Sequence, residues 1–174
     1  MDRAFSNKKY MIRIGLLSDT HNYLDPILLT HFEECDEIWH AGDVGTVAVT
    51  DELAKHKPIR VVYGNIDGND IRKTFPEHLR FHCEGVDVWM THIGGYPKKY
   101  DVLVREEIRS NPPKLFICGH SHILKVIYDD QLNLLHINPG AAGKYGFQMV
   151  RTAVRFTIDG NDIKDLEVIE LGKR

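Results

Sequence analysis

The stretch IRIGLLSDTH, residues 12–21, joins a buried-strand pattern to a polar cluster and indicates the fold class. Its first half, residues 12–17, is short and mostly apolar, which is typical of a strand covered on both faces. Its second half ends in Asp19 and His21, two side chains that core packing does not require at that point. Ligands of open α/β proteins bind at the carboxyl ends of strands, so this pattern favours an α/β fold with a site at a strand end.

Outward from this stretch, strands alternate with helices and then give way to a strand-rich end. A helix is predicted at residues 26–35, with Asp25 as N-cap and Pro26 in its first position. Further helices are predicted at residues 47–56, capped by Thr46, and at 101–110; strands are predicted at 12–17, 37–40, 59–63, 81–83, 86–91, 114–118, 125–129, 132–137, 152–158 and 162–169. The early βαβα order predicts a mainly parallel sheet, and the end of the chain predicts added antiparallel strands.

Composition indicates one globular domain over residues 11–174. The 174 residues are 43% hydrophobic and 27% charged, and the net charge of -3 favours neither a nucleic acid nor a membrane as partner. Residues 1–10 have no apolar h-region and are predicted to be a flexible leader, with translation starting at Met1 or Met11. Three scattered cysteines without a CxxC pair favour a reducing cytoplasm. The sequence leaves a homo-oligomer open.

Polar clusters follow five of the predicted strands and together contain metal-ligating side chains. Seven of these residues are candidate ligands: Asp19, His21, Asp43, Asn65, His92, His120 and His122. Residues two apart in extended chain point to the same side, so Asp-x-His and His-x-His can each supply two ligands. Mixed carboxylate, amide and imidazole donors suit transition metals, and seven ligands suit two ions that share one carboxylate.

Each of these motifs taken alone is compatible with a turn, a helix cap or a hydrogen-bonded histidine. The ordered set is what indicates a metal site. The order Asp-x-His, Gly-Asp, Gly-Asn-x-Asp, His, Gly-His-x-His resembles that of the calcineurin-like metallophosphoesterases, in particular their small single-domain phosphodiesterase branch. The resemblance extends from about residue 11 to Asn138-Pro139-Gly140.

This resemblance implies a fold and a ligand assignment. The fold is an α/β sandwich of two β-sheets flanked by helices, in four α/β/β/α layers. One metal is held by Asp19, His21, Asp43 and His122, and the other by Asp43, Asn65, His92 and His120. Asp43 thus bridges two divalent ions, with Mn²⁺ favoured and Fe, Ni, Co or Zn as alternatives, and the catalytic residues are Asp19, Asp43, Asn65 and His92.

The implied function is a metal-dependent phosphoesterase with a small phosphoester substrate and a metal-bridging hydroxide as nucleophile. Many relatives place a histidine after the asparagine as a general acid, whereas this chain has Ile66. This difference favours phosphodiesters over monoesters. Asp67 and His40 are expected to support the ligands indirectly. The alternatives are a non-catalytic protein-interaction scaffold on the same fold and a two-metal amide hydrolase.

Overall fold

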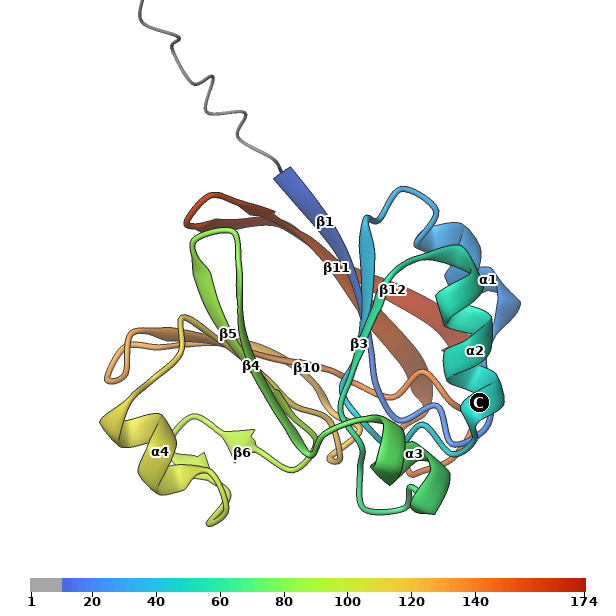
Figure 1. Ribbon diagram of the computed structural model, residues 1–174, viewed down its shortest axis with the longest axis horizontal. Coiled ribbons are helices and arrows are strands. Elements are labelled where there is room, and N and C mark those ends of the chain that lie inside the picture. The colour runs from blue at the N-terminus through green and yellow to red at the C-terminus, as the bar shows by residue number, and fades with distance from the viewer. Residues whose placement is uncertain (1–10) are drawn as a thin grey trace, which may run out of the picture.

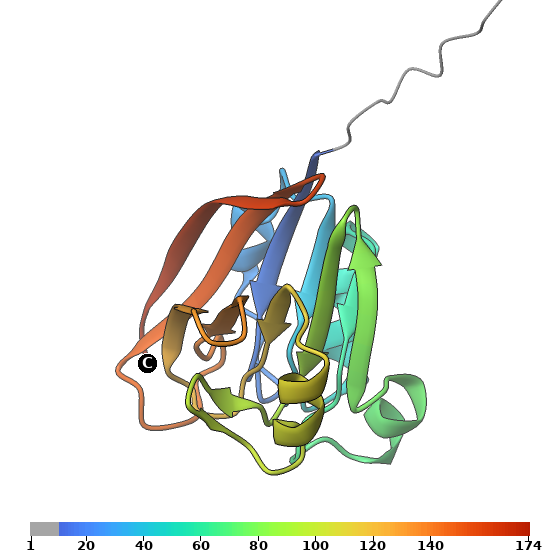
Figure 2. The same ribbon diagram turned by 90° about the vertical axis from the view of Figure 1, so that its left-hand side faces the viewer.

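Two five-stranded β-sheets lie face to face in the computed structural model, which describes residues 11–174, and short helices cover their outer faces (Figure 1). Figure 2 looks onto the second sheet, with α4 and β6 in front of it. The fold predicted by the family resemblance, a two-sheet sandwich flanked by helices, is confirmed. The leader expected at residues 1–10 lies outside the described residues. No helix within residues 11–174 is long and apolar enough to cross a membrane.

The first sheet has the strand order β12-β11-β1-β2-β3. Its strands are β1 (Met11–Leu17), β2 (Glu37–His40), β3 (Ile59–Val61), β11 (Val150–Asp159) and β12 (Asp162–Lys173). The strands β1, β2 and β3 are parallel, whereas β11 and β12 are antiparallel additions at the other side of β1. The predicted combination of an early parallel part and a late antiparallel part therefore holds for this sheet.

The second sheet has the order β4-β5-β8-β10-β9. Its strands are β4 (His78–Cys83), β5 (Val86–Thr91), β8 (Leu115–Ile117), β9 (Leu124–Asp129) and β10 (Leu134–Pro139). The central strands β5, β8 and β10 are parallel, and the edge strands β4 and β9 are antiparallel to them. The order of strands and helices along the chain does not indicate where this second sheet starts, and the structure places its first strand at β4.

The helices are short and differ in part from those predicted. They are α1 (Pro26–His31), α2 (Val47–His56), α3 (Asn69–Thr74) and α4 (Arg105–Ser110). Asp25 caps α1 as expected, because its side chain accepts a hydrogen bond from the backbone N–H of Ile27 at 3.2 Å. Thr46 stands at the N-cap of α2 without a side-chain cap bond.

Two predicted helices are shorter than expected, and some elements were not predicted at all. Helix α1 stops at His31, because the chain must turn to pair Asp36 with Arg13 at the start of β2. The side chain of Asp101 accepts from the backbone N–H of Leu103, and this local turn delays α4 to Arg105. Helix α3 and the small hairpin of β6 (Gly95–Tyr96) and β7 (Lys99–Tyr100) were missed, since each has too few residues for a periodic pattern.

Three apolar cores hold the four layers together. The central core lies between the sheets and combines residues of both, such as Leu16, Trp39, Val88 and Ile117. A second core packs α1, α2 and α3 on the outer face of the first sheet, and a third packs α4 on the second sheet. Alternation along β1 explains the first two, because Leu16 points to the central core and Leu17 to the helix-covered face.

Candidate metal centre

Six of the seven predicted ligands gather in two groups at the ends of the parallel strands. The groups are Asp19 with His21 and His122, and Asp43 with His92 and His120. Within each group the potential ligand atoms all lie within 4.8 Å of one another. The residues follow β1, β2, β5 and β8, so the two sheets contribute to one site even though they share no strand pairing.

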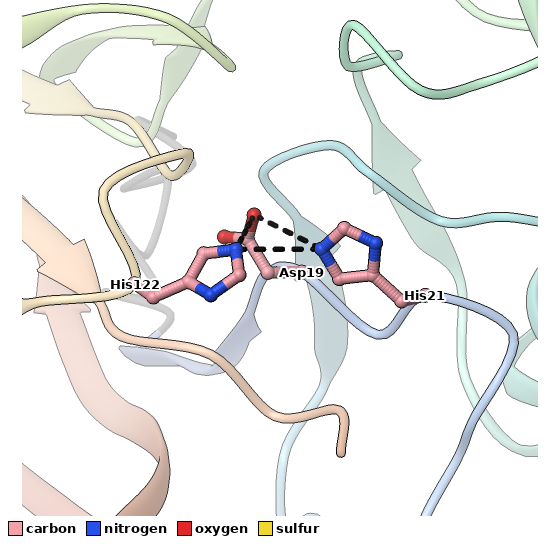
Figure 3. Close-up of side chains that lie close together, drawn as sticks. All are labelled: Asp19, His21 and His122. Carbon is pink, nitrogen blue, oxygen red and sulfur yellow. Dashed lines mark hydrogen bonds and ion pairs between the residues drawn. The ribbon is translucent and has the colours of Figure 1, made fainter. Parts of the chain in front are cut away.

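The first group converges on the buried carboxylate of Asp19 (Figure 3). The Nε2 atom of His122 lies 3.1 Å from Oδ1 of Asp19, and the Nε2 atom of His21 lies 3.8 Å from the same oxygen. The two Nε2 atoms are 3.3 Å apart. Two imidazole nitrogens and one carboxylate oxygen thus point at a common position, and such donors suit a divalent transition-metal ion.

Asp43 lies between the two groups. Its Oδ2 atom is 3.2 Å from Nε2 of His92 and 3.7 Å from Nε2 of His21. The ring of His120 is exposed and lies 5.3 Å from the ring of His92, centroid to centroid. The backbone N–H of His120 donates to Oδ2 of Asp19 at 3.2 Å, which leaves Oδ1 of Asp19 for the first group.

Asn65, the seventh predicted ligand, lies on the rim of a cavity beside the second group. This cavity of about 110 Å³ is lined by both Asn65 and His92. Asn65 is exposed, and its backbone carbonyl accepts from the Arg72 guanidinium at 3.1 Å. The structure therefore places Asn65 next to the second group, and its role as a ligand stays a prediction.

Two buried polar atoms of the site lack a hydrogen-bond partner among the described residues, and both are potential ligand atoms. They are Oδ1 of Asp19 and Nε2 of His92. The Nδ1 atom of His92 lies 2.8 Å from the carbonyl oxygen of Ala41, so Nδ1 carries the proton and Nε2 presents its lone pair to the site. Buried polar atoms are nearly always satisfied in folded proteins, so these atoms fit a bound cation.

The electrostatics of the site also favour a cation. Burial alone would lower the pKa of His92, but the carboxylate of Asp43, 3.2 Å from Nε2, and the charge of Asp19 outweigh burial and raise this pKa. Burial would likewise raise the pKa of Asp43, yet the adjacent ring of His92 lowers this pKa overall. The carboxylate of Asp43 therefore stays ionised and draws positive charge to the site.

Asp67 and His40 support the ligand loops and do not belong to either group. Asp67 accepts from the backbone N–H groups of Gly64 at 2.8 Å and Gly45 at 2.7 Å, which ties the loop after β3 to the loop after β2. His40 contacts Oγ1 of Thr20 through Nε2 at 2.9 Å and accepts from the backbone N–H of Gly42 through Nδ1 at 3.1 Å. Complete burial lowers the pKa of His40 to about 4, so its ring is a neutral bridge between two ligand loops.

The backbone at the site is held in an uncommon conformation. Five of the predicted ligands have positive φ angles: Asp19 (54°), His21 (46°), Asp43 (54°), His120 (67°) and His122 (58°). For a residue with a Cβ this left-handed region costs roughly 1–2 kcal/mol. Such strain is characteristic of functional sites, because the surrounding fold must hold it in place.

Two glycines allow the ligand loops to approach one another closely. A Cβ at Gly64 would lie 2.0 Å from Oδ1 of Asp43, and a Cβ at Gly119 would lie 2.0 Å from Oγ of Ser18 and 2.8 Å from Oδ2 of Asp19. Both contacts are shorter than van der Waals distance, so any side chain at these positions would displace a carboxylate ligand or its neighbour.

The structure also places residues beside the first group that the sequence motifs did not indicate. The ring centroid of Tyr145 lies 5.1 Å from that of His21. A Cβ at Gly146 would lie 2.1 Å from Nδ1 of His122 and 2.5 Å from a guanidinium nitrogen of Arg174, so these three residues are neighbours. No sequence motif predicted their place at the site, because Tyr145 and Gly146 lie in an irregular loop and Arg174 directly follows β12.

Comparison with known proteins identifies the family. The model of the calcineurin-like phosphoesterase superfamily domain matches residues 12–161. The chain therefore belongs to the calcineurin-like phosphoesterase superfamily, as the motif order indicated. Family membership and the two ligand groups together support a metal-dependent phosphoesterase that binds divalent metal ions.

Individual relatives agree with this assignment. A probable metallophosphoesterase of Methanothermobacter thermautotrophicus is 26% identical over 133 residues, which cover 74% of this chain and 76% of that protein. Among solved structures, an archaeal phosphodiesterase superposes with a TM-score of 0.72 at 22% identity, covering 91% of this chain and 100% of that one. Vps29 of Entamoeba histolytica in complex with zinc superposes with a TM-score of 0.71 at 16% identity, covering 91% and 99% of the two chains. The structural likenesses show the shared fold.

Proposed function

We propose that this protein hydrolyses phosphodiesters and that its two ligand groups hold two divalent transition-metal ions, with Mn²⁺ favoured. The observation that carries the proposal is the convergence of six carboxylate and imidazole side chains, within which Oδ1 of Asp19 and Nε2 of His92 are buried without a partner among the described residues. Harder cations such as Mg²⁺ bind through oxygen and water, whereas four imidazoles favour softer ions.

The predicted ligands would form two adjacent metal sites. Asp19, His21 and His122 would hold one ion, and His92 and His120 the other, with Asp43 between them. When bound, two such ions activate a water molecule and offset negative charge on the phosphoryl oxygens. Asn65 would complete the second group from the loop after β3. The strained loops keep these ligands preorganised, so little rearrangement accompanies the reaction.

The isoleucine at position 66 supports a preference for diesters. The side chain of Ile66 is 46% exposed, and its backbone N–H donates to Oδ1 of Asp43 at 3.1 Å. The backbone of this residue therefore orients a ligand, while its side chain offers no proton to a leaving group. Diesters carry less charge than monoesters, and those with good leaving groups need no strong general acid.

A non-catalytic scaffold is the alternative function, because Vps29 structures share this fold. The zinc complex of the Entamoeba protein means that metal binding by itself does not separate the two functions. The intact set of ligands in this chain favours the enzyme. Hydrolysis, and not metal content, is therefore the measurement that decides.

The test compares bis(4-nitrophenyl) phosphate with 4-nitrophenyl phosphate as substrates of the metal-depleted protein after addition of Mn²⁺, Mg²⁺ or Zn²⁺. We expect Mn²⁺-dependent cleavage with a higher kcat/KM for the diester. His92→Gln should abolish it, whereas His82→Gln, which changes an exposed histidine of β4, should not. A protein that binds metal but cleaves neither ester at a rate above that of free Mn²⁺ would instead support the scaffold.

A further inference from the structure

A loop and one arginine border the first ligand group and take no part in it. We call residues 144–149 together with Arg174 the site rim. The ring of Tyr145 packs against that of His21 at a centroid distance of 5.1 Å. Gly146 fits between His122 and Arg174, since a Cβ there would lie 2.1 Å from Nδ1 of His122 and 2.5 Å from Nη1 of Arg174. The rim is thus in direct contact with two of the predicted ligands.

The guanidinium group of Arg174 is buried and unpaired. Its Nε, Nη1 and Nη2 atoms have no hydrogen-bond partner among the described residues. The neighbouring cations are engaged, because Arg151 pairs with Asp25 at 2.7 Å and Lys144 lies 4.1 Å over the ring of Tyr23. A guanidinium has five donors, and leaving them unsatisfied is unfavourable. Arg174 is therefore free to bind an anion beside the ligand groups.

The same rim exposes large apolar side chains. Phe147 is fully exposed, and Met149 and Tyr145 are 73% and 70% exposed. Exposed apolar residues are common when isolated, but three within five residues, next to a polar site, indicate a binding surface. An aromatic ring can stack on such side chains, because every aromatic group offers an apolar face.

We propose that the site rim binds the substrate of the phosphodiesterase: Arg174 donates to a non-bridging phosphoryl oxygen, while Tyr145 and Phe147 contact an aromatic ester group. One unpaired cation next to an apolar surface matches a diester, which has a single negative charge and two organic groups. The substrate class is thus a phosphodiester with an aryl or nucleobase substituent. This inference rests on the proposed function for the identity of the reaction.

Binding of one alkyl and one aryl diester to metal-depleted protein, in which no hydrolysis is expected, tests the rim apart from catalysis. Isothermal titration calorimetry with dimethyl phosphate and diphenyl phosphate would be run on the metal-depleted protein. Arg174→Gln should weaken both ligands roughly 10-fold or more, since it removes a charge-assisted hydrogen bond. Phe147→Ser should weaken diphenyl phosphate alone, by about 10-fold. Arg174→Lys should recover part of the loss.

Matched controls remove the same chemistry from elsewhere on the surface. Lys173→Gln removes an exposed positive charge one residue away, and Tyr128→Ser removes a half-exposed aromatic ring from β9. Neither should change the affinity for either diester. Thermal melts of all variants would show that they fold.

Specific results would overturn the proposal. Unchanged affinity of Arg174→Gln for dimethyl phosphate excludes the phosphoryl contact, and a Phe147→Ser variant that weakens both ligands equally, or neither, excludes the aromatic contact. Sedimentation velocity showing a dimer that Phe147→Ser converts to monomer would assign the rim to contact between copies of this chain. If the variants show the expected affinities but the wild type cleaves no phosphoester, the proposed function fails and the proposal for the site rim is upheld. If the wild type cleaves diesters but the variants do not show the expected affinities, the proposed function is upheld and the proposal for the site rim fails.

Discussion

The Nε2 atom of His92 lies 3.2 Å from Oδ2 of Asp43, although the two residues follow strands of different sheets. The other ring nitrogen of His92 donates to the carbonyl oxygen of Ala41, on the strand side of the Asp43 loop. One histidine thus joins the two sheets at the site and presents its free nitrogen to the position between the ligand groups.

Removal of metal should abolish hydrolysis, and reconstitution should restore it with two ions per chain. Because four of the predicted ligands are imidazoles, Mn²⁺ should restore more activity than Mg²⁺. Elemental analysis after removal of excess metal, together with the initial rate of diester cleavage, checks both points. Fewer than one ion per chain after reconstitution with Mn²⁺ would contradict the two-metal site.

Asp43→Asn should reduce activity more than Asn65→Ala. Asp43 faces both groups, with Oδ2 at 3.7 Å from His21 and 3.2 Å from His92, whereas Asn65 adjoins one of them. Loss of even an indirect partner of a metal lowers affinity about 10- to 100-fold, so loss of a bridging charge should reduce kcat/KM by about 100-fold or more. Rates at saturating Mn²⁺ compare the variants. A larger loss for Asn65→Ala would show that Asp43 does not bridge.

Ile66→His should make diester cleavage less dependent on the leaving group. The wild type should cleave aryl diesters much faster than alkyl diesters, because a general acid contributes about 10²–10⁴-fold and matters most for poor leaving groups. The rate is measured over diesters of graded leaving-group pKa. Ile66→Gln is the control, since it is polar but does not titrate in this range.

If the cleavage rate of the wild-type protein depends only weakly on the pKa of the leaving group, another group supplies the proton. His40 is unsuited to this role. It is buried, and both its ring nitrogens are engaged, with Thr20 and Gly42. Lys98, which is exposed, would then be replaced.

His136 should make the protein less stable in mild acid. It is fully buried in β10, and burial lowers its pKa to about 4 from 6.5. The unfolded chain therefore takes up a proton first as the pH falls below 6.5, and stability decreases from there to about pH 4. The full effect is about 3 kcal/mol. His136→Leu should remove this part of the pH dependence.

Urea denaturation of metal-depleted protein at several pH values between 7 and 4 measures the free energy of unfolding and its slope with pH. His40, which burial also shifts to a pKa of about 4, is present in both proteins, so its effect cancels in the difference. The exposed-site variant His82→Gln should keep the wild-type slope. An unchanged slope in His136→Leu would mean that the buried ring is protonated or hydrated in the folded protein.

Much of the local structure could be predicted from the sequence, because it depends on residues near one another in the chain. Asp25 and Pro26 begin α1 as expected, since a cap bond to Ile27 spans two residues. The apolar residues of β1 and the glycine-flanked polar residues after the strands are likewise local patterns. The family order of Asp, His and Asn then indicated which residues belong to one site.

Only the tertiary structure decided how these parts meet. Periodicity along the chain indicates strands but not the point where a second sheet starts, and the two sheets were implied by the family resemblance alone. The contact of His92 with Asp43 spans the two sheets, and that of Gly146 with His122 and Arg174 joins loops with no period of their own. Such contacts depend on the packing of distant segments, and no local pattern in the sequence encodes them.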